Sequence, residues 1–258
     1  MNATDTPNPA LFDLTGRVAI VTGGSRGIGL AIAKGFAAHG AKVVVASRKA
    51  EACDAAVKEI EAAGGQALGI ATHLGELDAL QALVERTAEH FGGIDIVVNN
   101  AANPLAQPLG EYTPEAWQKS HEVNLRGPVF LVQYALPYLR RSAHASVINV
   151  ISAGVFLRSE PTSLYASGKA GLLAFTRAAA GRFATEGIRV NALAPGTVDT
   201  DMVRNNGPER VASMSKASPM GRIGTPEEMV GPALLLASDA GSYITGQVIS
   251  ADGGLAIH

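Results

Sequence analysis

The sequence predicts a single α/β domain, built as a doubly wound parallel sheet with helices on both faces. Two observations carry this prediction. Short β-branched runs alternate along the chain with longer alanine-rich segments, as in parallel sheets whose strands are joined by right-handed helical crossovers. In addition, the 258 residues are 47% hydrophobic and 17% charged, which suits one large domain with an extensive core.

Each element follows from its local pattern. The runs expected to form buried strands are short, rich in Val, Ile and Ala, and bounded by turn residues; they cover 17–22, 42–47, 66–72, 94–99, 145–152, 188–194 and 247–251. Helical patterns lie between them, at 28–39, 49–63, 76–91, 114–140, 164–186 and 226–237.

Two segments fall outside this alternation. Residues 1–13 are expected to form a flexible N-terminal arm in front of one domain at 14–258. Residues 200–222 are polar and contain Asn205-Asn206-Gly207-Pro208. A long irregular insertion after a strand end predicts a lid over a substrate site.

Composition argues against several classes of protein. The formal net charge is −2 and no basic patch is evident, so nucleic acid is not expected as a partner. The one cysteine, Cys53, has no Cys/His cluster around it, and no metal site is predicted. We find neither a signal peptide nor an apolar run of the ~18 residues that a membrane span needs. A cytoplasmic protein is therefore expected.

A glycine-rich stretch follows the first strand. Residues 22–29 read TGGSRGIG and lead into a helix. Gly23, Gly27 and Gly29 permit a tight turn and close approach of a ligand, and the N-terminus of the helix offers free N–H groups to a phosphate. The stretch therefore predicts a dinucleotide phosphate site, with Ser25, Arg26 and Ile28 among its contacts.

The same residues admit a rival interpretation. Gly23 to Gly27 also fits G-x-S-x-G, the nucleophile elbow of serine hydrolases, with Ser25 as the nucleophile. The histidines available as its base, His121, His144 and His258, are poorly placed in the sequence for that role. A hydrolase is thus a remote alternative.

The end of the second strand bears on the choice of cofactor. NAD sites carry an acidic residue there, which binds the ribose 2′-OH. This strand ends in Ala46-Ser47-Arg48 without a carboxylate. Arg48, together with Arg26 of the glycine loop, suits the 2′-phosphate of NADP(H). We therefore predict NADP(H) rather than NAD(H).

Further along the chain, a tyrosine and a lysine lie four positions apart in SLYASGKAG, so Tyr165 and Lys169 share one face of a helix. Taken alone, this spacing is most often simple packing. With TGGSRGIG, Asn99-Asn100-Ala101, Asn124, Ser152 and Pro195-Gly196, however, it forms an ordered set, and Ser152 precedes Tyr165 by 13 positions. In this set the chain resembles the short-chain dehydrogenase/reductases over nearly its whole length.

The resemblance implies a Rossmann-type domain of about seven parallel strands, usually assembled as homotetramers or homodimers. It implies that Tyr165 is the general acid/base, that Ser152 donates to the substrate oxygen, and that Asn124 anchors a water leading to Lys169. A phenol has an ordinary pKa of ~10, and a cation ~5 Å away at an effective dielectric of ~20 contributes about 3 kcal/mol. Lys169 is therefore expected to lower the pKa of Tyr165 by roughly two units.

The resemblance also assigns cofactor contacts. Asn99 and the residues after it follow the fourth strand on the adenosine side, and the residues after Pro195 border the nicotinamide. The assigned set is Gly23, Ser25, Arg26, Gly27, Ile28, Gly29, Ser47, Arg48, His73, Leu74, Asn100, Ala101, Tyr165, Lys169, Pro195, Gly196, Val198 and Thr200. Two departures from the family pattern stand out: Ala102 replaces a glycine, and His73-Leu74 replaces Asp-Val.

Together these residues predict an NADP(H)-dependent oxidoreductase that interconverts a ketone or other carbonyl with a secondary alcohol. A 3-oxoacyl thioester reductase and a sugar, polyol or steroid dehydrogenase stay open as alternatives, as does a non-catalytic dinucleotide-binding protein. Residues 103–109, 153–162 and 200–220 are expected to line the substrate pocket.

Overall fold

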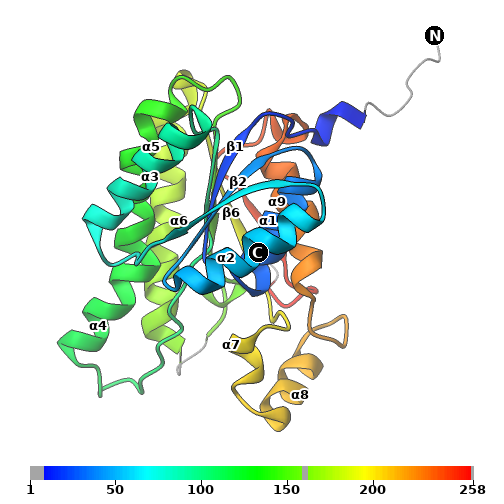
Figure 1. Cartoon of the computed structure of the whole chain (residues 1–258). Coiled ribbons are helices and arrows are strands. Elements are labelled where there is room, and N and C mark those ends of the chain that lie inside the picture. The colour runs from blue at the N-terminus through cyan, green and yellow to red at the C-terminus, as the bar shows by residue number, and fades with distance from the viewer. Residues whose placement is uncertain (1–8, 159–161, 257–258) are drawn as a thin grey trace.

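The computed structural model describes residues 9–158 and 162–256. These residues contain a seven-stranded parallel sheet in the order β3-β2-β1-β4-β5-β6-β7 (Figure 1). The strands are β1 (Val18–Thr22), β2 (Lys42–Ser47), β3 (Gln66–Ala71), β4 (Ile96–Asn99), β5 (Ser146–Val150), β6 (Arg189–Pro195) and β7 (Val248–Ala251). The predicted fold class is confirmed.

Helices connect the strands and cover the sheet. The α-helices are α1 (Gly27–Ala38), α2 (Ala50–Ala62), α3 (Leu77–Phe91), α4 (Pro114–His121), α5 (Gly127–Leu139), α6 (Ser163–Phe183), α7 (Asp201–Arg204), α8 (Pro208–Ala217) and α9 (Val230–Ala237). Short 3₁₀ turns occur at η1 (Pro9–Phe12), η3 (Ala153–Val155), η5 (Ala184–Glu186), η6 (Pro226–Met229) and η7 (Asp239–Gly241), and a π turn, η2, spans Glu122–Arg126.

Alternation along the strands divides the core into two layers. In β1, Ala19 and Val21 pack with residues of α1, α2 and α9, whereas Ile20 packs with residues of α3, α5 and α6. Figure 1 shows these two sets of helices on opposite sides of the sheet. Because both faces are covered, the strands are mostly apolar, as the hydrophobic runs indicate, with buried polar residues such as Thr22, Asn99 and Asn149 at a few positions.

Three predicted segments differ in detail. The helix expected at 114–140 is interrupted by the π turn Glu122–Arg126. The segment 200–222 is not irregular, since it contains α7 and α8, which project from the end of the molecule in Figure 1. Of the arm predicted at 1–13, residues 1–8 lie outside the described part, but Pro9–Phe12 forms a 3₁₀ turn that contacts η7.

The strand order reverses direction between β1 and β4. From β1 the chain first winds outward through β2 and β3, and then returns to build the other half of the sheet from β4. At such a switch point the connections leave the carboxyl ends of the two strands in opposite directions and open a crevice, where ligands of open α/β sheets bind. The glycine loop follows β1 at this point, so the fold places it beside the residues that follow β4.

A chain of buried polar side chains links the central strands to α6. Asn99 at the end of β4 donates from Nδ2 to Oδ1 of Asn149 at 2.8 Å, and Asn149 donates to Oγ1 of Thr176 in α6 at 2.8 Å. All three residues are fully buried. The expectation that Asn99 follows the strand on the cofactor side is therefore wrong: Asn99 ends the strand, and its side chain holds the core together.

We expect Asn149→Ala to lower the free energy of unfolding by about 1–3 kcal/mol, because it strands buried polar groups of Asn99 and Thr176. Asn205→Ala, at an exposed position after α7, should change it by less than about 0.5 kcal/mol. Urea unfolding of the three proteins at one concentration measures both effects. Equal stability of the two variants would contradict a structural role for the buried chain.

Candidate active site

Ser152, Tyr165 and Lys169 meet at the carboxyl edge of the sheet. Ser152 lies two residues beyond β5 and begins η3, where its Oγ accepts a hydrogen bond from the N–H of Gly154 at 3.1 Å. Its own hydroxyl bonds to Tyr165, which lies in the first turn of α6. The structure thus brings together the serine and tyrosine that the sequence placed 13 residues apart.

Lys169 lies one turn further along α6 and is 1% exposed. Its Nζ donates to the carbonyl of Val150 at 2.7 Å and lies 5.8 Å from the ring centroid of Tyr165. An ammonium group has three N–H donors, and the bond to Val150 uses one of them. Lys169 therefore retains donors for a ligand beside Tyr165.

Burial sets the pKa values of this pair. It raises the pKa of Tyr165 to about 12, although the hydrogen bond from Ser152 acts in the opposite direction. Burial likewise lowers the pKa of Lys169 to about 7. The expected lowering of the phenol pKa by Lys169 is therefore wrong for the protein alone: desolvation of the phenol dominates, and the effect that opposes it is the hydrogen bond from Ser152.

Asn124 is fully buried within the π turn between α4 and α5. Its side chain pairs with the backbone of Asn103 in both directions: Nδ2 donates to the carbonyl at 2.8 Å, and Oδ1 accepts from the N–H at 3.0 Å. It also packs against α6, where a Cβ on Gly168 would lie 3.0 Å from Cβ of Asn124. Asn124 thus joins the loop after β4 to the helix that carries Tyr165.

The glycine loop is built for close approach of backbone. Gly23 and Gly27 have φ of +63° and +53°, which favour glycine. A Cβ on Gly29 would lie 2.3 Å from the carbonyl oxygen of Gly23. Helix α1 begins at Gly27 without a side-chain cap from Arg26, so its first N–H groups face the loop. Ile28 packs in part against the core beside this turn.

A serine pair joins the loop to the end of β2. Oγ of Ser25 donates to Oγ of Ser47 at 2.9 Å, which draws the backbones before Arg26 and Arg48 together. Both arginines are exposed, and Arg26 makes a distant ion pair with Asp201 at 3.5 Å. With its hydroxyl committed to Ser47, Ser25 has none of the geometry of a hydrolase nucleophile.

Of the residues predicted to contact the cofactor after β3 and β6, some lie at the site and others are buried in the core. His73 is half-buried, and its Nδ1 accepts from the N–H of Gly75 at 3.1 Å, which leaves Nε2–H to donate. Leu74 and Val198, by contrast, are 4% and 3% exposed and pack in the hydrophobic core. Their side chains are not part of the site. Only the backbone of Leu74 and Val198 is left for the predicted contact with a cofactor.

The segment that follows β6 reaches the glycine loop. Pro195 is its last, buried residue, and a Cβ on the following Gly196 would lie 2.7 Å from Cα of Asp252. Thr200 approaches the loop itself, since a Cβ on Gly27 would lie 3.0 Å from Cγ2 of Thr200. The segments after β1 and β6 thus form one continuous rim.

Comparison with known proteins agrees with this geometry. A family model described as enoyl-(acyl carrier protein) reductase matches residues 23–256. A short chain dehydrogenase/reductase of Aspergillus oryzae is 39% identical and covers 98% of this chain and 99% of its own length. A 3-oxoacyl-[acyl-carrier-protein] reductase of Chlamydia muridarum is 40% identical over 94% of this chain and 98% of its own.

The chain belongs to the short-chain dehydrogenase/reductase family. A crystal structure of a 3-oxoacyl (acyl-carrier-protein) reductase from Agrobacterium tumefaciens C58, with NADP bound, superimposes with a TM-score of 0.91 at 37% identity, covering 98% of this chain and 100% of the other. The protein is therefore an oxidoreductase of the class that acts on CH–OH and C=O groups.

Sequence reasoning missed two residues that shape the site of this short-chain dehydrogenase/reductase. Thr22, the buried last residue of β1, accepts hydrogen bonds at Oγ1 from the N–H groups of Asn100 at 3.0 Å and Ala101 at 3.1 Å. Asn103 is the second, through its backbone bonds to Asn124. A polar residue closing an apolar strand is the signal that marks Thr22, whereas Asn103 lies in a loop without a motif.

Two further findings concern alternatives to the dehydrogenase/reductase site. Among the described residues, no helix is long and apolar enough to span a membrane. The described part of the chain also contains no group of three or more His, Cys, Asp or Glu side chains that could hold a metal ion.

Ala102 has no positive φ, so the backbone there accommodates the Cβ that replaces the family's glycine.

We expect Lys169→Met to flatten the dependence of stability on pH. The pKa of Lys169 is about 7 in the folded protein and ~10.4 in an unfolded chain. Between these values the unfolded state binds more protons, so the free energy of unfolding of the wild type rises with pH. Below pH ~7 both states are protonated, and the contribution of Lys169 is constant.

Urea unfolding between pH ~7 and ~9.5, without added cofactor, measures this slope. Lys58→Met is the control, because Lys58 is exposed on α2 and should keep the slope of the wild type. Parallel curves for Lys169→Met and the wild type would show that the amine is not desolvated in the folded protein.

Proposed function

We propose that the protein is an NADP(H)-dependent carbonyl reductase in which Tyr165 is the general acid. One observation carries the proposal: Ser152 and Tyr165 are hydrogen-bonded to each other, with Lys169 one turn away, at the carboxyl edge of the sheet. A substrate carbonyl oxygen placed beside this pair would accept a hydrogen bond from each of the two hydroxyls.

The residues fit a dinucleotide. The positive φ values of Gly23 and Gly27, and the 2.3 Å approach that a Cβ on Gly29 would make to the carbonyl oxygen of Gly23, define a tight turn that only glycine permits at the start of α1. The uncapped N-terminus of α1 adds N–H donors for a pyrophosphate. Arg26 and Arg48, exposed beside the linked Ser25 and Ser47, suit a 2′-phosphate, and the absence of an acid at the end of β2 disfavours NAD(H).

In the catalytic step, bound NADPH supplies the hydride for the carbonyl carbon. Ser152 holds the carbonyl oxygen through its O–H, which donates to Tyr165 when no substrate is present and turns to the carbonyl oxygen when substrate binds; the N–H of Gly154 occupies only a lone pair of its Oγ. Tyr165, which burial keeps protonated at neutral pH, passes its proton to the oxygen as negative charge develops there. Lys169 stabilises the resulting phenolate from one turn away.

Lys169 has a second role. With its pKa at about 7, it exchanges protons readily near neutral pH and can restore the proton of Tyr165. Val150 fixes the amine through its carbonyl, and the remaining N–H groups would bind the ribose of a cofactor and a water chain past Asn124. We retain the proposal that Asn124 supports this chain through its backbone, because its side chain is occupied by Asn103.

For the substrate we propose a small or medium-sized ketone. Val155, Phe156 and Leu157 follow Ser152 and present apolar side chains that are at least partly exposed. The proposed lining at 153–162 includes 159–161, which lie outside the described residues. A 3-oxoacyl thioester is the second candidate, since a 40% identical relative is named as a reductase of that substrate. Sugar, polyol and steroid alcohols stay as alternatives.

We also propose, from family resemblance, that the protein is cytoplasmic and assembles as a homotetramer or homodimer. Helices α7 and α8, which follow Thr200, are proposed as the lid. They project beyond the sheet edge that carries Tyr165 (Figure 1) and begin where Thr200 approaches the glycine loop. A helical hairpin on two short connections can move as a unit over this edge.

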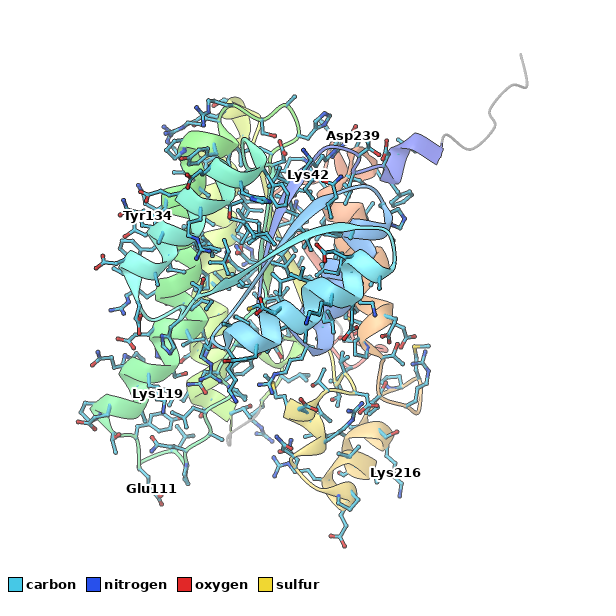
Figure 2. All side chains as sticks on the ribbon, in the orientation of Figure 1. Lys42, Glu111, Lys119, Tyr134, Lys216 and Asp239 are labelled. Carbon is cyan, nitrogen blue, oxygen red and sulfur yellow. The ribbon has the colours of Figure 1, made fainter. Side chains whose placement is uncertain are left out.

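We expect Tyr165→Phe to lower kcat for ketone reduction by about 10²- to 10⁴-fold, because it removes the proton donor and little else. NADPH consumption with a panel of ketones, oxoacyl thioesters and polyols measures the effect. Tyr134→Phe, on α5 (Figure 2), is the matched control and should keep the activity of the wild type. Should wild type and Tyr165→Phe share one negligible rate on every substrate, the protein is a non-catalytic dinucleotide-binding member and the proposal is wrong.

We expect Arg48→Asp to reduce the preference for NADPH over NADH by about tenfold or more, since it replaces a cation facing the 2′-phosphate by an acid that accepts from the 2′-OH. The ratio of kcat/KM values with the two cofactors measures this preference. Lys58→Asp makes the same charge change on α2 away from the strand end and should leave the ratio unchanged. An unaltered ratio in Arg48→Asp would exclude this arginine from cofactor selection.

A further inference from the structure

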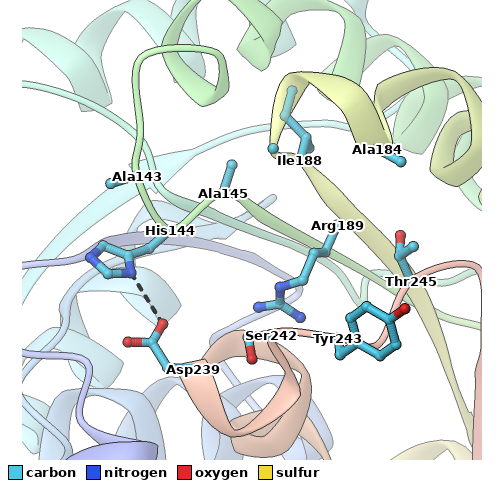
Figure 3. A pocket seen from close by; sticks show the side chains of 11 residues that line it. Ala143, His144, Ala145, Ala184, Ile188, Arg189, Asp239, Ser242, Tyr243 and Thr245 are labelled. Carbon is cyan, nitrogen blue, oxygen red and sulfur yellow. Dashed lines mark hydrogen bonds and ion pairs between the residues drawn. The ribbon is translucent and has the colours of Figure 1, made fainter.

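A cavity lies at the opposite end of the strands from Tyr165. Its volume is about 440 Å³, and it is enclosed by the chain entering β5, by the connection from η5 into β6, and by the segment between η7 and β7 (Figure 3). These are the amino ends of the strands. In Figure 2, Asp239, one of its lining residues, lies at the far end of the molecule from Lys216 of α8.

Arg189, the first residue of β6, projects into this cavity (Figure 3). Its guanidinium donates to the carbonyls of Leu236 at 2.7 Å and Ser238 at 3.2 Å, at the end of α9. Among the described residues, it makes no ion pair with a carboxylate. Since a guanidinium carries five N–H donors, Arg189 retains donors that point away from those carbonyls.

The acidic side chain in the lining is already neutralised. Asp239 pairs with Arg17 at 2.9 Å, and its Oδ1 accepts from Nδ1 of His144 at 3.1 Å. Arg17 is itself 7% exposed. Asp239 thus pairs with Arg17 and not with Arg189, and two arginines beside one carboxylate give the cluster a net positive charge within a partly enclosed space. Burial, followed by the proximity of Arg17, lowers the pKa of Arg189, which reflects this unbalanced charge.

Hydroxyls and apolar groups complete the lining. Thr245 accepts at Oγ1 from the N–H of Val190 at 3.1 Å, so its O–H is directed elsewhere. Tyr243 is wholly exposed, and its ring stands beside Arg189 at the rim in Figure 3. Ala145 and Ile188 also border the cavity, but both are 1% exposed and belong to the core. The combination of a guanidinium fork, hydroxyl donors and an aromatic face matches an organic carboxylate with an apolar body.

We propose that this cavity is a binding site for a small organic monocarboxylate, whose carboxylate pairs with Arg189 and whose apolar body packs against Tyr243. The cavity is separate from the catalytic residues, because it lies at the amino ends of the strands and they lie at the carboxyl ends. A ligand here contacts η7 and the end of α9, which Arg189 and Arg17 tie to the sheet through carbonyls.

Benzoate is the probe, and isothermal titration calorimetry of the full-length protein is the measurement. We expect wild-type protein to bind benzoate and not benzamide, which has the same body without the charge. Arg189→Met should weaken benzoate binding by about tenfold or more. Because Arg189 also holds the end of α9, Tyr243→Ala is the second variant: it leaves the scaffold intact and should weaken binding several-fold.

Two control variants locate the site. Arg48→Met removes a cation of the proposed cofactor site, and Arg210→Met removes an exposed cation of α8; both should keep the affinity of the wild type. Loss of binding in Arg48→Met would place benzoate at the cofactor site and overturn the proposal. So would equal affinities for benzoate and benzamide, or unchanged binding in Tyr243→Ala. If benzoate fails to bind while Arg189→Met alters the oligomeric mass, the cavity is an interface between copies of the chain and the proposal is wrong.

Discussion

The attachment of α6 to β5 is the constraint on which the active site depends. Two polar contacts fix it: Lys169 donates to the carbonyl of Val150, and Thr176, two turns later, accepts from Asn149. The acceptor Val150 and the donor Asn149 are neighbours on β5, whereas Lys169 and Thr176 lie two turns apart on α6. The long side chain of Lys169 spans this extra distance along the helix. Ser152 follows Val150 by two positions, so the same contacts that hold the helix also set where Tyr165 stands relative to Ser152. Catalytic geometry is thus a consequence of core packing.

The same burial determines which proton is available. Loss of hydration raises the pKa of the Tyr165 phenol, the hydrogen bond from Ser152 lowers it, and the first effect is larger. The pKa of Tyr165 at about 12 corresponds to roughly 3 kcal/mol in favour of the protonated phenol relative to water. Lys169 is affected in the opposite sense, with its pKa at about 7. A protonated donor beside a readily exchanging amine suits carbonyl reduction, in which a proton must be delivered as hydride arrives.

Much of the fold could be predicted from the sequence, because its determinants are local and periodic. Continuous apolar runs mark strands buried on both faces, and the glycines of 22–29 mark a turn that other residues cannot make. The order of motifs also brought Ser152, Tyr165 and Lys169 together correctly. What failed depends on contacts that only the folded chain defines. Leu74 and Val198 lie next to site residues in sequence, yet their side chains turn into the core. The desolvation of Lys169 is likewise a property of packing, and no spacing rule contains it.

The two ends of the proposed cofactor site obey different electrostatics. Arg26 and Arg48 are exposed, so their attraction for a phosphate acts through water and is screened by salt within a Debye length of about 8–10 Å. Lys169 is almost wholly buried and Tyr165 partly so, and their interaction is governed by hydration and hydrogen bonds more than by ionic strength. Selection of the cofactor therefore responds to the solution, while the proton transfer responds to packing around α6. Because the two ends act separately, a change of charge at Arg26 or Arg48 leaves the buried surroundings of Lys169 undisturbed.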